Sequence, residues 1–82
     1  MALADTGDPK YHYALAKHYY FLKDEDPEAG KKAVEWLTRA AEMGVPVACR
    51  ELSQLFLSGE LVPKNTERAS FWSKKAEELE RS

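Results

Sequence analysis

The sequence predicts an all-α fold, an α/α solenoid made of two antiparallel helix hairpins. Three observations support this prediction. Proline occurs three times where a helix would begin, the position at which its missing N–H is harmless. No segment shows the sustained alternation of apolar and polar residues that is typical of strands. Apolar and small residues recur at a separation of 36 or 37 positions, which indicates a repeated structural unit.

The first helix is predicted to begin at Asp8-Pro9, with Asp8 as the N-cap. Residues at helical spacing place one side of this helix in the core. The polar run 23–26 ends the helix. The residues expected in the core are Tyr11, Leu15, His18, Tyr19 and Leu22.

The pair Asp26-Pro27 repeats the start signal and predicts a second helix, which ends near Met43 because Gly44 suits a left-handed residue. Pro46 begins a third helix, which ends at Ser58-Gly59. Asn65 or Thr66 caps a fourth. The residues expected in the core are Ala33, Trp36, Leu37, Ala40 and Ala41 in the second helix, Ala48, Leu52, Leu55 and Phe56 in the third, and Ala69, Trp72, Ala76 and Leu79 in the fourth.

The second pair of helices repeats the first. A shift of 36 residues brings Ala33, Trp36 and Ala40 onto Ala69, Trp72 and Ala76. A shift of 37 residues brings Tyr11, Leu15, Ala16 and Tyr19 onto Ala48, Leu52, Ser53 and Phe56. A period of this length with two helices per unit is typical of α-solenoids. We therefore predict a single domain, 1–82, with a first repeat at about 7–43 and a second at about 44–80.

The repeated residues also resemble a known family. The segment Ala-Val-Glu-Trp-Leu-Thr-Arg-Ala-Ala-Glu-Met-Gly at 33–44, followed by Ala48, Leu52 and Phe56 and then by Ala69, Trp72 and Ala76, resembles the Sel-one-like repeat, a relative of the tetratricopeptide (TPR) repeat. The resemblance covers residues 7–79 and implies a TPR-like fold and a role as an adaptor or scaffold that binds proteins. The sequence departs from the family pattern at Ala16, Leu22 and Ser53, where glycine is usual.

Composition and charge argue against several function classes. The 12 Lys and Arg residues against 14 Asp and Glu give a net charge of −2, without the basic excess of a nucleic-acid binder. No apolar stretch approaches the ~20 residues of a membrane span. The start of the chain lacks the basic lead and apolar run of a secretory signal. We therefore expect no nucleic acid, no membrane contact and a cytoplasmic location.

Residues with catalytic or metal-binding chemistry are sparse. His12 and His18 are six residues apart, on different faces of a helix, and cannot chelate a metal as an i, i+4 pair would. The sequence contains no Gly-rich phosphate loop and no nucleophile paired with a base. The single cysteine, Cys49, is expected to be a buried, inert thiol. We therefore expect no enzymatic activity, no metal and no cofactor.

A candidate partner-binding surface lies opposite the predicted core face of the first helix. The aromatic and cationic residues there match a face of the third helix, and in repeats of this family the first helix of each pair lines the concave groove. Tyrosines would serve as rigid anchors and cations would bind acidic groups. With cations and no carboxylate expected in the groove, we expect an acidic segment or a free C-terminal carboxylate as the ligand. The expected groove residues are Lys10, Tyr13, Lys17, Tyr20, Arg50, Gln54 and Leu57.

Other interpretations remain open at this stage. Tyr13 and Tyr20 could simply cover apolar surface or pack against upstream repeats. The alternative function is structural: self-association through the amino-terminal helix face, or membership of a longer repeat array. Near the carboxyl end of the chain, the fourth predicted helix carries polar residues where the second carries apolar ones: Ser70, Ser73 and Glu77 correspond to Val34, Leu37 and Ala41. We expect these polar residues to be exposed and to cap the array.

Overall fold

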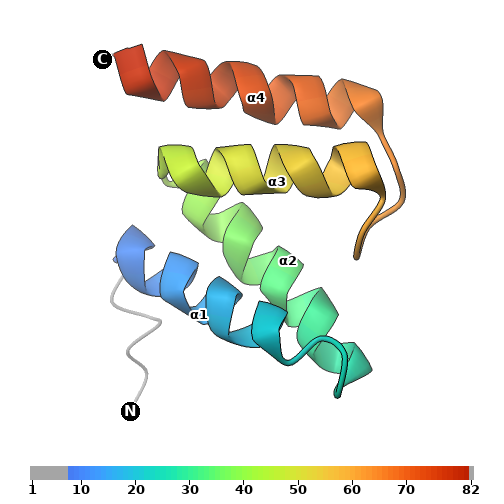
Figure 1. The fold of residues 1–82 in the computed structure, drawn as a ribbon. Coiled ribbons are helices and arrows are strands. Elements are labelled where there is room, and N and C mark those ends of the chain that lie inside the picture. Colours follow the sequence, from blue (N-terminus) through green and yellow to red (C-terminus); the bar gives the residue numbers. More distant parts are fainter. Residues whose placement is uncertain (1–7, 82) are drawn as a thin grey trace.

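The computed structural model describes residues 8–81, which form four α-helices and no strand within that range. The helices are α1 (Pro9–Phe21), α2 (Pro27–Glu42), α3 (Pro46–Ser58) and α4 (Thr66–Arg81). Figure 1 shows α1 and α2 as one antiparallel hairpin and α3 and α4 as a second, with α2 packed against α3. The predicted all-α solenoid is confirmed. The predicted repeat start at residue 7 and the predicted lack of a secretory signal concern residues 1–7, which lie outside the described residues.

The helices begin where the capping residues predict. Asp8 and Asp26 each accept a hydrogen bond from the backbone N–H two residues on, at 2.9 and 3.0 Å. Asn65 caps α4, since its Oδ1 accepts from the Arg68 N–H at 3.0 Å. Gly59 ends α3 with φ 76°, a left-handed backbone conformation that costs free energy for residues other than glycine. Local signals therefore define both ends of α3 and the start of every other helix.

The four helices pack closely because most buried positions carry small side chains. Ser53 Oγ donates to the Ala69 carbonyl at 2.7 Å, and Cys49 Sγ donates to the Ala41 carbonyl at 3.6 Å. These bonds satisfy buried polar groups and tie α3 to both α4 and α2. The expected burial of Cys49 is confirmed. The main core cluster consists of Ala16, Leu37, Ala40, Ala41, Ala48, Cys49, Leu52, Leu55, Trp72 and Ala76.

The predicted core face of α1 is partly wrong. His18 is exposed, whereas His12 is buried and its ring lies 5.2 Å from that of Trp36. The residue of α3 that corresponds to His18 is Leu55, which is buried in the same cluster as Leu37 of α2. Within residues 8–81, no helix covers the corresponding side of α1. Its buried face is therefore narrower than that of α3 and is turned toward α2.

The polar residues expected on the outer face of α4 are mostly exposed. Ser70 and Glu77 are exposed, as predicted, but Ser73 is half-buried. Leu37 and Ala41, the counterparts of Ser73 and Glu77 in α2, are buried. The polar residues of α4 thus lie on a face against which no further helix of the described chain packs. Ser73 is more buried than predicted.

Candidate partner-binding groove

A cleft of about 360 Å³ lies between α1 and α3. It forms because α2 packs against both of these helices, which leaves α2 as the floor and α1 and α3 as the walls. The floor is largely apolar and the rim is polar. The lining residues are Ala16, Lys17 and Tyr20 of α1, Ala33 and Leu37 of α2, Glu51, Gln54, Leu55 and Ser58 of α3, and Glu60 of the following loop.

The structure brings together some of the predicted groove residues and separates others. Lys17, Tyr20 and Gln54 line the cleft. Tyr13 lies at its edge, half-buried, in contact with a carboxylate of the lining. The remaining predicted residues, Lys10, Arg50 and Leu57, are exposed and do not line the cleft.

Glu51 contacts two side chains of α1, one through a hydrogen bond and one through an ion pair. The Tyr13 hydroxyl donates to its Oε2, and the Lys17 Nζ lies 3.7 Å from the same oxygen. The pKa of Tyr13 is raised to about 12, first by burial and further by the hydrogen bond to Glu51 and the negative charge of Glu51. Tyr13 is therefore a hydroxyl donor throughout the physiological range, and it holds Glu51 from across the groove.

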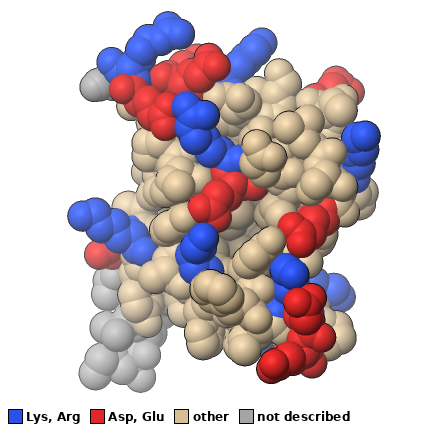
Figure 2. Space-filling view, viewed as in Figure 1, with Lys and Arg blue, Asp and Glu red and all other residues tan. Residues whose placement is uncertain are grey.

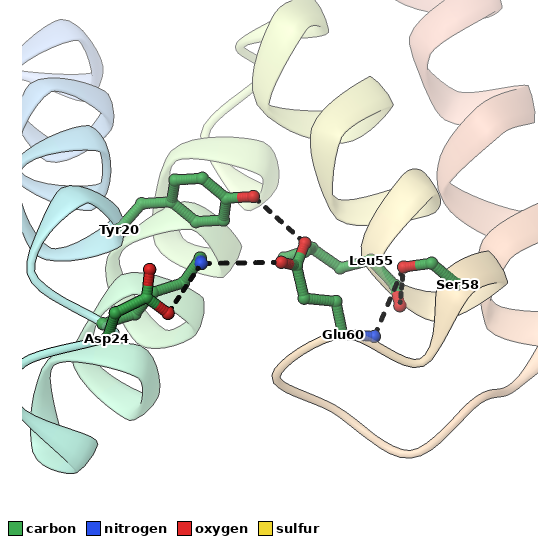
Figure 3. Close-up of polar contacts among 6 residues, drawn as sticks. Tyr20, Asp24, Leu55, Ser58 and Glu60 are labelled. Carbon is green, nitrogen blue, oxygen red and sulfur yellow. Dashed lines mark hydrogen bonds and ion pairs between the residues drawn. The ribbon is translucent and has the colours of Figure 1, made fainter.

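Glu60 makes a similar pair of contacts at the other end of α1 (Figure 3). The Tyr20 hydroxyl donates to its Oε1 at 3.0 Å, and the Lys23 Nζ lies 3.7 Å from its Oε2. The hydrogen bond to Glu60 raises the pKa of Tyr20, with burial adding to the rise. Lys23 also pairs with Asp24 at 3.3 Å, so its positive charge is shared between two carboxylates.

Arg50 turns away from the cleft and toward α4. Its Nε donates to Glu80 Oε2 at 2.8 Å, and its Nη2 donates to Glu80 Oε1. This bidentate pair lowers the pKa of Glu80. The expectation that Lys17 and Arg50 point into one concave surface is therefore wrong, because a carboxylate on the neighbouring helix binds the guanidinium.

The premise of an acid-free groove is also wrong. Glu51 and Glu60 both line the cleft. Figure 2 shows acidic and basic side chains interspersed on this face rather than a basic patch. Glu51 lies one turn before Gln54 on α3, and that spacing could have predicted its place in the lining. Glu60 lies in a loop, where no periodicity indicates which way a side chain points.

Ser58 carries the one serine hydroxyl of the described lining, and this hydroxyl donates to the Leu55 carbonyl at 3.4 Å rather than to a base. Among residues 8–81, no group of three or more His, Cys, Asp or Glu side chains is arranged to hold a metal ion. No helix in the same range is long and apolar enough to cross a membrane.

Comparison with protein-family models identifies a repeat family. The Sel1 repeat family model matches the chain twice, at residues 9–45 and 46–80. Each match covers one helix hairpin of the structure. No curated protein and no solved structure matches the chain significantly.

Proposed function

Because the chain belongs to the Sel1 repeat family, whose repeats are generally protein-interaction modules, we propose that it binds a segment of a partner protein in the groove between α1 and α3. The observation that carries this proposal is the cleft itself, which combines an apolar floor with a polar rim. Such clefts bind ligands by burying an apolar anchor while the rim fixes the orientation of the ligand.

The size of the cleft suits a short segment of chain. A volume of about 360 Å³ is at the lower end of small-ligand pockets, which begin at roughly 300 Å³. It admits one or two side chains of a ligand, while the rest of the ligand would run along the open groove. Leu37 of the floor and Leu55 of the α3 wall supply the largest aliphatic side chains of the lining and would contact the anchor.

Site-specific photo-cross-linking tests this proposal. A photoreactive residue in place of Gln54 lies in the cleft, and the same residue in place of Ser70 lies on the outer face of α4. In a lysate of the source cells, the position-54 probe should cross-link a partner protein and the position-70 probe should not. Cross-linking only at position 70, or equally at both positions, would contradict the proposal.

The acidic ligand that the sequence suggested loses its main support. Among the cleft-lining residues, Lys17 is the one cation, and it already lies 3.7 Å from Glu51. An acidic segment would place its charge near both Glu51 and Glu60. An acidic ligand is therefore kept as an alternative, and the peptide experiments described below distinguish it from a cationic ligand.

Self-association is a second candidate function, favoured by one exposed aromatic residue. Phe21 is 79% exposed at the end of α1, in register with the exposed residues Ala14 and His18. These three residues occupy the side of α1 that corresponds to the buried Leu55 side of α3. A second copy packed there would cover Phe21. Sedimentation should then show an oligomer that Phe21→Ser dissociates, whereas a monomeric parent chain would exclude this function.

A further inference from the structure

Resting on the proposed groove function, we propose that the bound segment presents a cationic side chain, an arginine in preference to a lysine, to the carboxylates of Glu51 and Glu60. Charge complementarity and unused acceptor capacity support this choice of ligand. The apolar floor of the cleft explains why an extended cationic side chain fits there.

The charge of the cleft favours a cation. Its lining contains the two carboxylates and the single cation Lys17, which gives a formal charge of 1 − 2 = −1. Lys23 lies beside Glu60 but is offset by Asp24. A cationic ligand would reduce this negative potential, and an acidic ligand would increase it.

The two carboxylates have acceptor capacity that the protein does not use. A carboxylate offers about four lone-pair positions on its two oxygens. The contacts that Tyr13 and Lys17 make with Glu51 are both at Oε2. Glu60 receives one contact on each oxygen. Both side chains can therefore accept further hydrogen bonds without losing those that position them.

The existing lysine contacts are weak enough to yield to a ligand. The Nζ–Oε2 distances of 3.7 Å, from Lys17 to Glu51 and from Lys23 to Glu60, exceed the ordinary hydrogen-bond range. The carboxylate side chains are 36% and 44% exposed, so a ligand can reach them. Partly exposed ion pairs at this distance contribute little free energy. A guanidinium, whose planar donors match a carboxylate, would bind more strongly than either lysine.

The floor of the cleft suits the stem of such a ligand. Ala16, Ala33, Leu37 and Leu55 supply the apolar part of the lining, beside the two carboxylates. The methylene groups of an arginine pack on apolar surface while its charged end remains at a polar rim. Ala16 and Ala33 are small, which leaves room above them for the stem. The cleft therefore combines the two features that an arginine side chain requires.

Capped peptide pools test the proposal. Four pools of randomised peptides, acetylated and amidated to remove terminal charges, carry a fixed central Arg, Lys, Gln or Glu. The parent protein should bind the Arg pool about tenfold more tightly than the Gln pool, the Lys pool less tightly than the Arg pool, and the Glu pool least. In the double variant Glu51→Gln and Glu60→Gln, the preference for Arg should be lost. The amides still accept the tyrosine hydrogen bonds, so the helical content should not change.

Matched controls separate this inference from the proposed function. The variant Glu35→Gln with Glu42→Gln makes the same charge change on exposed positions of α2 and should keep the Arg preference. Gln54→Trp fills the cleft and should lose binding to all pools. Binding that Gln54→Trp abolishes, but without an Arg preference or with a Glu preference, overturns the inference and leaves groove binding intact. Equal signals from the parent and Gln54→Trp overturn both. If the double variant fails to fold, Glu60→Gln alone provides the same comparison.

Discussion

Two tyrosine side chains contribute to both the core and the groove. Tyr13 and Tyr20 pack against the core cluster with their rings, while their hydroxyls hold Glu51 and Glu60. A tyrosine can do both because its body is apolar and its end is polar. The sequence pattern identified both tyrosines as residues of the groove but gave no indication of their hydrogen-bond partners, which come from a different helix and a loop.

The difference in burial between α1 and α3 predicts unequal effects of equivalent substitutions. Leu15 and Leu52 occupy matching repeat positions, but Leu52 is 1% exposed and Leu15 is only half-buried. Leu52→Ala should lower the free energy of unfolding by ~2–5 kcal/mol, as buried large-to-small changes do, and Leu15→Ala by clearly less. Urea denaturation of both variants measures this difference. Equal losses would show that α1 is covered as fully as α3.

The environment of Tyr13 predicts a pH dependence at high pH. Its pKa is raised from 10.0 to about 12, so the folded state retains a proton that the unfolded state loses. The stabilising contribution is complete below pH 10.0 and is lost as the pH rises through about 12. Titration of tyrosinate absorbance should show a late step that Tyr13→Phe lacks. A Tyr13→Phe titration identical to that of the parent above pH 10.0 would contradict this assignment.

At the scale of helices, local signals predicted more than packing patterns did. Proline at the first position and an aspartate cap act on the backbone of their own helix, and α1 and α2 begin where these signals predict. Which face of α1 is buried depends on its neighbours, and the prediction placed His18 rather than His12 in the core. The loop after α3 has no periodicity, so the position of Glu60 in the groove could not be predicted.

The cap of α2 is a measurable part of its stability. The Asp26 side chain accepts from the Glu28 N–H at 3.0 Å, which satisfies one of the free donors at the helix start. Asp26→Ala should lower the free energy of unfolding by ~1 kcal/mol, and Asp26→Ser should restore most of it. Glu25→Ala, an exposed change in the same turn, is the control and should have little effect. Thermal denaturation compares the variants, and similar losses for Asp26→Ala and Glu25→Ala would contradict the capping role.

For the whole molecule, the stacking of two hairpins creates the groove. Because α2 packs against both α1 and α3, these two helices form separate walls of the groove and α2 forms its floor. The period of the sequence predicted this arrangement, and it predicted that Lys17, Tyr20 and Gln54 share a surface. The prediction of its charge was wrong, because side-chain contacts between helices change it: Arg50 binds Glu80 of α4, and Glu51 contacts Tyr13 of α1.

The sign of the ligand charge can be determined by reversing one cation of the groove. Lys17→Glu changes the formal charge of the lining from −1 to −3, since one positive charge becomes negative. A partner that presents arginine to the groove should then bind more tightly, by about threefold or more at low salt, and the gain should shrink as salt is added. Arg50→Glu lies outside the cleft and should change the affinity little, as should Lys74→Glu on the exposed surface of α4. Titration calorimetry with the Arg peptide pool or the captured partner measures these changes. Weaker binding by Lys17→Glu alone would instead identify an acidic ligand, because repulsion would then replace an attraction that Lys17 supplies.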